Sequence, residues 1–390
     1  MATTTVRNRI IPFFRPTIGA AEIAAITDCL RGGWLTSGPR VGELELKLAE
    51  LCGRRFAVAL NSATSALHVL LRLAGVRPGD EVITTPFTFV ATAEAALYLG
   101  ARPVFADVDD ATLNLDPDSV ERLITRRTRV IMPVHFAGHL CDMPALLRIA
   151  RRHGLAVVED AAHALSARAG AWRCGDETLG AALSFYATKE LTVGEGGALV
   201  TDDAAVAERA RCLALHGLSR DAWTRYRPGS SARYDVVDLG YKMNLPDVLA
   251  ALGLPQIERL AEQRARREAI ARRYDQALAG LPGIRTPIVR RGHVSSRHLY
   301  VIRVEPERAR RSRDELALEL GDRGIATSVH FRPLFEMTYY RNLGYTASAC
   351  PVAARAGREV LSLPIYPELA DADQDCVVNA VREVILRSGR

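Results

Sequence analysis

The sequence predicts an α/β protein with a large, mostly parallel sheet and a smaller α+β part at its C-terminal end. Short apolar strands alternate with helices through the first half of the chain, which is the pattern of βαβ units. Small and polar residues recur where these strands end, at the edge where α/β sheets bind ligands. The length of 390 residues exceeds one ordinary core, so we expect two domains, residues 1–255 and residues 256–390.

The large domain opens with two predicted helices, at residues 20–31 and 41–51, and the loop between them reads GGWLTSGP. Seven strands follow, at residues 56–60, 81–85, 103–108, 130–135, 155–159, 181–186 and 198–201. Helices are predicted between the first five of these strands, at residues 62–74, 90–99, 117–124 and 143–153. Because strands and helices alternate in this order, we expect a seven-stranded sheet that is covered by helices on both faces.

The small domain follows a long helical pattern at residues 247–278 and a linker with two prolines and two glycines at residues 281–297. We predict strands at residues 298–304 and 326–331, and helices at residues 312–320 and 372–386. Such a mixture of separate strands and helices is typical of an α+β arrangement.

Composition limits the classes of function. The net charge of +6 is spread along the chain, and the arginine-rich helix interleaves glutamates and has few aromatic residues, so we expect no nucleic-acid partner. We also expect no signal peptide and no membrane contact, because no apolar run approaches the necessary length. The seven cysteines are scattered without a Cys-x-x-Cys pair, which is typical of a reducing compartment, so we expect a soluble, cytoplasmic protein.

Lysine is rare in this chain: of 51 basic residues, only Lys47, Lys189 and Lys242 are lysine. A lysine amine loses its proton and attacks a carbonyl, whereas a guanidinium stays protonated. Lys189 lies between an apolar strand and a glycine-rich turn, and it is our candidate for a Schiff-base lysine, with a plain surface lysine as the alternative. Lys47 lies among glutamates on a helix surface. Lys242, in the loop GYKMN, competes for the reactive role, but Ser184 in the preceding strand places Lys189 at the ligand edge.

Two further clusters lie at this predicted edge. The run NSATSA, which contains Thr64 and Ser65, starts a helix, where N–H groups favour a phosphate, although an ordinary helix cap explains the same residues. Asp160 ends a buried strand and needs a partner such as a protonated ring nitrogen of a cofactor, although it also suits a cap of the next segment. His163 follows shortly afterwards and is placed to contact the same ligand.

These clusters point to one cofactor. Phe87 adds an aromatic surface to the phosphate cradle, the acid and the amine. Pyridoxal phosphate requires N–H and hydroxyl donors for its phosphate, a carboxylate for its ring nitrogen and a lysine amine for its aldehyde. His135, His139 and Cys141 are of metal-ligand types at short spacing, but no second ligand pair follows them, so we expect no metal site.

Several separated runs carry a family resemblance. They read EDAAHALSA, LSFYATKELTVGEGGALVT, LGYKMNLPDVLAALGLPQIERL and SVHFRPLF, together with GGWLTSGP and ALNSATSALHVLL near the start. From about residue 11 to residue 385, the sequence resembles the DegT/DnrJ/EryC1/StrS family of sugar aminotransferases. The resemblance implies the aspartate-aminotransferase-like fold of type I transferases, pyridoxal 5'-phosphate as cofactor, and a homodimer with shared active sites.

The resemblance also implies a role for each candidate residue. Lys189 matches the imine-forming lysine, and Asp160 matches the partner of the ring nitrogen. The other cofactor contacts that it implies are Thr64, Ser65, Phe87, His163, Ser184 and Asn244. Asn244 falls in the segment through which the partner subunit reaches the phosphate, with Lys242 as the alternative for that contact. Trp34 and His330 match substrate-side positions.

The activity implied is transfer of an amino group from L-glutamate to the keto group of a dTDP- or UDP-linked 4-keto sugar, in amino-sugar biosynthesis. Two alternatives stay open at this point. One is an aminotransferase that acts on a keto-cyclitol in antibiotic biosynthesis. The other is a non-catalytic sensor or regulator that keeps the same fold.

Overall fold

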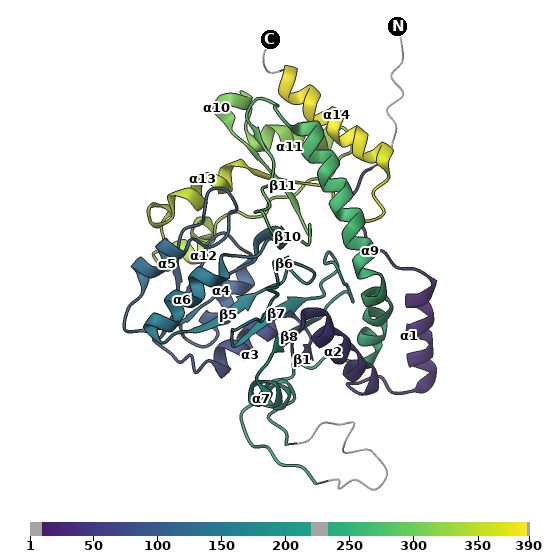
Figure 1. The fold of residues 1–390 in the computed structure, drawn as a ribbon, viewed down its shortest axis with the longest axis vertical. Coiled ribbons are helices and arrows are strands. Elements are labelled where there is room, and N and C mark those ends of the chain that lie inside the picture. The colour runs from purple at the N-terminus through teal and green to yellow at the C-terminus, as the bar shows by residue number, and fades with distance from the viewer. Residues whose placement is uncertain (1–9, 220–232, 388–390) are drawn as a thin grey trace.

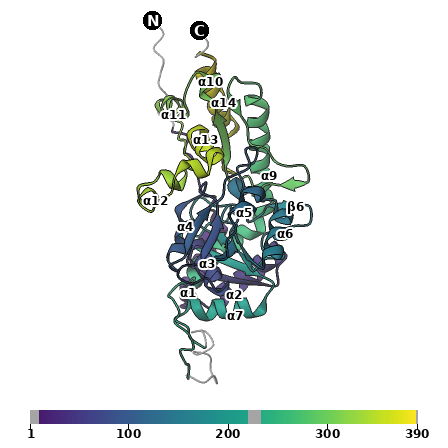
Figure 2. The same cartoon turned by 90° about the vertical axis from the view of Figure 1, so that its left-hand side faces the viewer.

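The computed structural model describes residues 10–219 and 233–387. Its elements form a large part built on a sheet and a smaller part that contains the C-terminal helix, and the small part lies above the large one in Figures 1 and 2. None of the helices in the described residues has both the length and the apolar character that a membrane crossing requires.

The large part is organised by a seven-stranded sheet. Its strands are β1 (Phe56–Leu60), β2 (Glu81–Thr84), β3 (Arg102–Phe105), β4 (Thr128–Ile131), β5 (Ala156–Asp160), β7 (Gly180–Ser184) and β8 (Gly197–Thr201). Their order across the sheet is β1-β8-β7-β5-β4-β2-β3. β8 is antiparallel to both of its neighbours, and the pairs from β7 to β3 are parallel. The mostly parallel, seven-stranded sheet predicted from the sequence is therefore confirmed.

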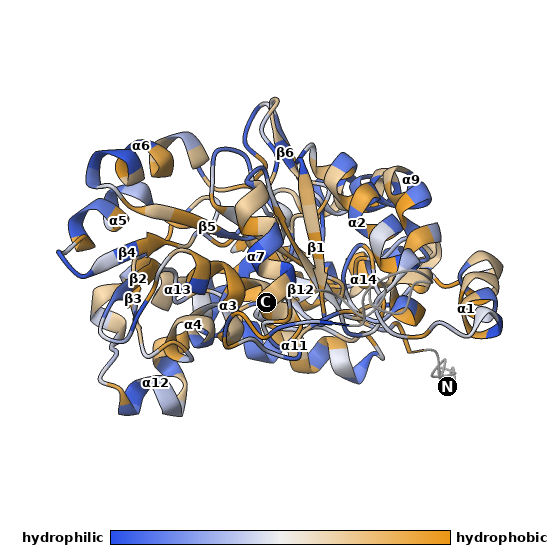
Figure 3. Ribbon diagram, turned by 90° about the horizontal axis from the view of Figure 1, so that it is seen from below, coloured by the Kyte–Doolittle hydropathy of each residue, from blue (hydrophilic) through white to orange (hydrophobic). Residues whose placement is uncertain are grey.

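Side chains alternate between the two faces of this sheet, and each face is covered by helices. Val58 and Leu60 join a core with α3 (Ala63–Leu73) and α7 (Ala204–Ala214), whereas Ala57 and Ala59 join a core with α2 (Pro39–Cys52). The remaining helices of this part are α1 (Ala20–Gly32), α4 (Val90–Leu97), α5 (Pro117–Leu123) and α6 (Met143–His153). Figure 3 shows apolar strands in the middle and hydrophilic outer surfaces on α5 and α6.

The small part is built around a three-stranded antiparallel sheet. β11 (Tyr300–Val304) lies between β12 (Val360–Leu363) and β9 (Ile284–Arg285). The helices of this part are α10 (Pro306–Ala309), α11 (Arg313–Asp322), α12 (Thr338–Asn342), α13 (Pro351–Glu359) and α14 (Asp371–Arg387). A separate two-stranded sheet joins β6 (Arg168–Ala169) from the large part to β10 (His293–Val294).

The 32-residue helix α9 (Asp247–Leu278) connects the two parts. Its first half contributes Ala250 and Leu254 to the core with α2, and its second half contributes Ile270 and Tyr274 to the core of the small part. The helix runs through residue 255, where the sequence-based division into domains was drawn, so a single rigid element spans that division.

One predicted strand is wrong. Residues 326–331 form no strand: Ser328 makes an isolated bridge with Ser362 on the edge strand β12, and the N–H of Ala326 donates to the carbonyl of Ile11 at 3.0 Å. The segment has the apolar alternation of a strand, but it leaves the sheet after this single bridge. His330 and Phe331 are thereby directed toward the large part, where both take part in the ring contacts described below.

Candidate active site

The carboxyl ends of neighbouring strands bring the candidate residues together. β5 ends at Asp160 and β7 ends at Ser184, and the two strands run parallel, with Asp160 opposite Ala182. Lys189 follows β7 in a turn in which its N–H donates to the carbonyl of Tyr186 at 2.9 Å. Since parallel strands end at the same sheet edge, the acid and the amine lie on one side of the molecule.

Lys189 has an altered acidity. Burial lowers its pKa from 10.5 to about 8, although the nearby carboxylates of Asp160 and Glu190 act in the opposite direction. Its Nζ lies 3.5 Å from Nε2 of His298. An amine with this pKa is neutral in a substantial fraction of molecules near neutral pH, which is the form that attacks a carbonyl.

Asp160 is a buried carboxylate that is oriented by hydrogen bonds. Its side chain is 6% exposed and accepts a hydrogen bond from the hydroxyl of Thr92 at 2.7 Å and one from the N–H of Ala162 at 3.1 Å. The Thr92 hydroxyl is in turn hydrogen-bonded to that of Thr88 at 2.8 Å. These neutral donors orient the buried carboxylate, and a carboxylate held in this way suits a protonated ring nitrogen.

Aromatic rings line the space beside Asp160. The ring of His163 stacks with Phe331 at a centroid distance of 5.9 Å and lies 4.5 Å from the ring of His298. Nδ1 of His163 has no hydrogen-bond partner among the described residues. Burial lowers the pKa of His163 well below its ordinary value, so the ring is neutral. Phe87 is fully buried and contacts Phe331 at 6.5 Å, which connects it to the same group of rings.

The start of α3 is the place where the sequence predicts a phosphate cradle. Ser62 is the residue that caps the helix, because its hydroxyl accepts the N–H of Ser65 at 3.1 Å, and the hydroxyl of Ser65 donates to Asn61 at 2.6 Å. Gly197 on β8 passes so close that an added Cβ would lie 2.4 Å from the backbone nitrogen of Ala63. Gly197 is also paired with Ser184, so the register of β7 and β8 brings Ser184 toward this helix end, beside Thr64 and Ser65.

Trp34 and Asn244 lie together, because the side chains of both donate hydrogen bonds to Ser37. The amide of Asn244 donates to the hydroxyl of Ser37 at 2.7 Å, and the indole N–H of Trp34 donates to the carbonyl of Ser37 at 3.2 Å. Lys242 is exposed and donates to the side chain of Asn244. This unit adjoins the cradle of its own chain, because the N–H of Asn61 donates to the carbonyl of Met243 at 2.7 Å.

His330 reaches the site from the small part. Its Nδ1 is 2.8 Å from the hydroxyl of Ser362, and its ring stacks with Phe13 at 5.6 Å. Burial, followed by the nearby Lys189 charge, lowers its pKa to about 4, so the ring is neutral. The site therefore lies between the two parts, with the predicted substrate-side residue on the small one.

Sequence reasoning missed three residues that contribute to this geometry. His298 was interpreted only as the start of a strand, Phe331 as part of a strand that does not form, and Thr92 as an ordinary helix residue. A usable signal existed for Thr92, because Thr88 and Thr92 are four residues apart and face the same side of a helix start. No local pattern marked His298 or Phe331, since both approach the site from distant parts of the chain.

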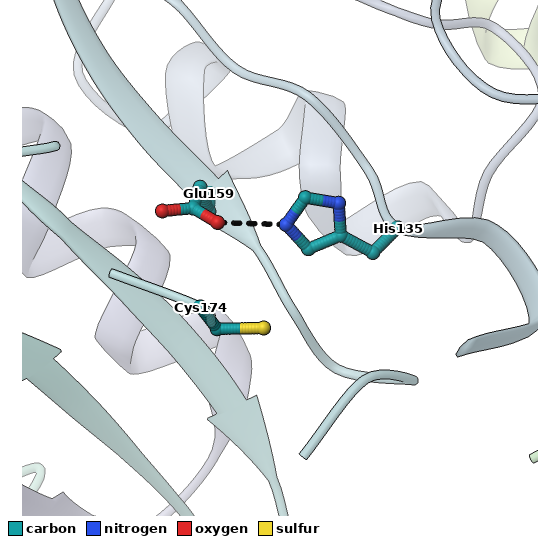
Figure 4. Close-up of side chains that lie close together, drawn as sticks. All are labelled: His135, Glu159 and Cys174. Carbon is teal, nitrogen blue, oxygen red and sulfur yellow. Dashed lines mark hydrogen bonds and ion pairs between the residues drawn. The ribbon is translucent and has the colours of Figure 1, made fainter. Parts of the chain in front are cut away.

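Among the described residues, His135, Glu159 and Cys174 form a group whose donor atoms all lie within 4.8 Å of one another (Figure 4). The N–H of Cys141 donates to Nδ1 of His135 at 3.1 Å, so the ring carries its proton on Nε2 and donates it to Glu159 at 2.7 Å. Glu159 also accepts the hydroxyl of Thr178 at 2.7 Å. Burial raises the pKa of Cys174 well above its ordinary value, which disfavours the thiolate that binds metals. Hydrogen bonding accounts for this group.

The hydrogen bond between His135 and Glu159 shows that His135 does not lie near the ligand, as its position at a strand end had suggested. Its position at a strand end had suggested a residue near the ligand, but its side chain is fully buried against Glu159. Glu159 and Asp160 are consecutive on β5, so their side chains point to opposite faces of the sheet. His135 follows Glu159 and therefore supports the strand from the face opposite the site.

The residues at this edge fit pyridoxal phosphate. The cradle formed by Ser62 and Gly197 offers the first-turn N–H groups of α3 to a phosphate. Asp160 suits the ring nitrogen, the unpartnered Nδ1 of His163 lies in a stack of rings, and Lys189 supplies an amine of lowered pKa. The donor set thus matches each functional group of that cofactor.

Comparisons with known proteins agree with this chemistry. The model of the DegT/DnrJ/EryC1/StrS aminotransferase family matches residues 16–382. The spore coat polysaccharide biosynthesis protein SpsC of Bacillus subtilis (strain 168) is 45% identical over 381 residues, which are 97% of this chain and 98% of SpsC. The PLP-form of Spr1654 from Streptococcus pneumoniae superposes with a TM-score of 0.90 at 34% identity, covering 97% of this chain and 100% of that one.

A third similar structure is DesI, determined in the presence of its TDP-sugar product. It has a TM-score of 0.87 at 32% identity and covers 97% of this chain and 93% of its own. The family model spans nearly all of the chain, and the folds agree over the same range. The chain therefore belongs to the DegT/DnrJ/EryC1/StrS aminotransferase family and is a sugar aminotransferase that uses pyridoxal phosphate.

Proposed function

We propose that this aminotransferase moves the amino group of L-glutamate to the keto group of a nucleotide-linked sugar, of the dTDP- or UDP-4-keto class. The observation that carries the proposal is the buried amine of Lys189, whose pKa is lowered to about 8 and which lies at the same sheet edge as Asp160. The similarity to DesI, which was determined with a TDP-sugar product, supports a nucleotide-linked substrate.

Each residue then has a defined task. Pyridoxal phosphate, when bound, supplies a reactive aldehyde and a ring that accepts electrons. Asp160 keeps a proton on the ring nitrogen, since its carboxylate is buried and held by Thr92. His163 and Phe87 would hold the ring by contact, and Thr64, Ser65 and Ser184 would supply contacts to the phosphate.

Lys189 carries the proton. Its Nζ takes a proton from the α-carbon of the amino donor as general base and later returns one as general acid. A group with a pKa of about 8 serves both directions near neutral pH, because neither protonation state is rare. The exposed Lys242 lies in a separate unit with Asn244, which favours Lys189 over its rival.

The substrate side of the site is proposed to include Trp34 and His330. His330 is neutral and partly buried, with its Nδ1 engaged by Ser362, so it presents a shaped surface rather than a charge. The mildly basic chain, with a net charge of +6, favours the approach of an anionic diphosphate.

We also propose that a second copy of the chain completes the site. Two exposed apolar side chains are close in sequence to candidate site residues: Phe89, which is 61% exposed, follows Phe87, and Tyr186, which is 47% exposed, precedes Lys189. The segment before Asn244 adds Val236, Val237 and Leu239, which are 61%, 61% and 80% exposed. Exposed apolar side chains of this size are candidates for contacts with a second copy of the chain. In such a homodimer, Asn244 and Lys242 are the candidates for contacts to the partner's phosphate.

The function is tested by two half-reactions. Purified enzyme loaded with the cofactor is mixed with L-glutamate and then with dTDP- and UDP-keto sugars, and the visible absorbance is followed. We expect loss of the absorbance with glutamate, its recovery with a keto sugar, and an amino sugar whose position of amination is identified by NMR. Recovery with a keto-cyclitol but with no nucleotide sugar would reassign the substrate, and absence of any response to amino donors would favour a sensor.

Substitution of Lys189 tests whether its amine is the reactive group. Lys189→Ala is expected to lower turnover by about a thousandfold or more while the circular dichroism spectrum stays unchanged, because the amine is the proton carrier and not a packing element. Lys242→Ala tests the rival under the same conditions. Turnover by Lys189→Ala together with its loss in Lys242→Ala would transfer the role to Lys242.

A further inference from the structure

His298 lies beside the reactive amine, at the start of the chain segment that leads into β11. Its Nε2 is 3.5 Å from Nζ of Lys189, and its side chain is only 5% exposed. Its ring centroid is 4.5 Å from that of His163. The imidazole therefore lies close both to the reactive amine and to the ring of His163.

The backbone around His298 is held in place by Ser296. The fully buried hydroxyl of Ser296 donates to the carbonyl of His163 at 2.6 Å and accepts the N–H of His298 at 3.2 Å. The N–H of Ser296 donates to the carbonyl of Gly138 at 3.0 Å. A Cβ at Gly138 would lie 1.9 Å from the Ser296 hydroxyl, so this close approach requires glycine. One serine thus fixes His163 and His298 relative to each other.

Charge and burial define the state of the imidazole. Burial lowers the pKa of His298 well below its ordinary value, with the nearby Lys189 charge acting in the same direction, so the ring is neutral. The other groups that face Lys189 are the carboxylates of Asp160 and Glu190 and the neutral rings of His163 and His330. Nδ1 of His298 has no partner among the described residues, so it is available to carry the ring proton and leave Nε2 as an acceptor.

We propose that His298 is a positioning residue for Lys189: its Nε2 accepts a hydrogen bond from Nζ and holds the free amine at the point from which it moves protons. The inference rests on Lys189 being the reacting lysine of the proposed function, and it is independent of the identity of the sugar. A neutral acceptor stabilises the ammonium form of Lys189. Removal of the acceptor is therefore expected to lower the pKa of Lys189 further.

The test measures the acidity of Lys189 directly. The full-length protein is freed of its cofactor by dialysis and acetylated with acetic anhydride over a pH series, and the extent of reaction is read peptide by peptide by mass spectrometry. Lys47, which is paired with Glu258 on the surface, is the internal reference in every sample. We expect a midpoint near 8 for Lys189 in the unmodified chain.

Two amide variants separate a hydrogen bond from mere packing. Gln presents its oxygen at about the depth of Nε2, whereas Asn is too short to reach Nζ. His298→Gln is expected to keep the midpoint, and His298→Asn to lower it by about one pH unit. In the holoenzyme, His298→Asn should lower kcat about tenfold with little change in KM for the sugar, and His298→Gln should recover most of kcat.

A midpoint that stays the same in His298→Asn would overturn the proposal. So would a rise toward that of an exposed lysine, because entry of water after loss of packing raises the pKa of a buried lysine, whereas loss of an acceptor lowers it. The acetylation requires neither glutamate nor sugar, so an error in the proposed substrate leaves its result unaffected.

Discussion

Lys189 is surrounded differently from the chain's other two lysines. Lys47 forms an ion pair with Glu258, which raises its pKa, and Lys242 is exposed and donates to Asn244. Lys189 alone among them lies against neutral rings beside a buried carboxylate, and burial lowers its pKa to about 8. The sequence contains only three lysines, and any of them could be the reactive one. Desolvation distinguishes Lys189 from the other two, because burial lowers its pKa.

This acidity predicts how the cofactor-free enzyme captures pyridoxal phosphate. The attacking form is the neutral amine, whose fraction grows as the pH rises through the pKa of Lys189, so the capture rate should increase up to about pH 8 and then level off. Stopped-flow absorbance over pH 6–10 measures the rate. A rate that continued to rise to pH 10 would indicate a lysine with its ordinary acidity, and Lys189→Ala should show no capture at any pH.

At the scale of elements, two strands determine where the chemistry lies. β5 places Asp160 on the face of the site and Glu159 on the opposite face, where Glu159 accepts hydrogen bonds from His135 and Thr178. β8 passes the start of α3 at Gly197, which leaves no room for a side chain. The cradle therefore depends on contact between a strand and a helix that are far apart in the sequence.

Substitution of Gly197 tests this contact. Gly197→Ala would place a Cβ 2.4 Å from the backbone nitrogen of Ala63, so either β8 or the first turn of α3 must shift. We expect a loss of about 3 kcal/mol in the free energy of unfolding and a weaker affinity for pyridoxal phosphate. Thermal melting and cofactor titration measure the two effects.

The matched control is Gly42→Ala in α2, where no atom lies within 4 Å of the added Cβ and stability should be kept or raised. Equal behaviour of the two variants would contradict the role of Gly197.

At the scale of the whole molecule, the site lies between two parts that are joined by α9. Phe13 and His330 approach from the N-terminal segment and the small part, while Lys189 and Asp160 belong to the large sheet. Exposed apolar side chains such as Phe89 and Leu239 would be costly in an isolated subunit. This arrangement favours a shared site in a homodimer.

The proposed homodimer predicts a specific effect of Leu239→Asp. Leu239 is 80% exposed, and a carboxylate there would have to be buried against the second copy, so the variant should be monomeric and lose most of its activity. Size-exclusion chromatography with light scattering reports the mass. Leu318→Asp on α11, whose leucine is 71% exposed in the small part, should stay dimeric and active. A Leu239→Asp protein that remains an active dimer would place the interface elsewhere.

The sequence by itself determined the elements of the large sheet and the family. Apolar periodicity predicted seven strands and their alternation with helices, and the predicted α9 at residues 247–278 has the bounds that the structure shows. Separated motifs indicated pyridoxal phosphate as the cofactor, and they predicted Lys189 as the imine-forming residue and Asp160 as the partner of the ring nitrogen. Such information is local, because periodicity and motifs depend on neighbouring residues. For the same reason the segment at residues 326–331 was misread as a strand, since pairing depends on a partner elsewhere in the chain.

The tertiary structure alone decided the surroundings of these residues. The depressed pKa of Lys189 arises from burial by segments that are distant in the sequence, and its neighbour His298 is 109 positions away. Strand register and sheet order decide two further contacts. They direct Glu159 toward His135, and they bring Gly197 against the start of α3. Desolvation and close contact are properties of the packed chain, so acidity and fit are set by the fold, whereas residue type and local pattern are set by the sequence.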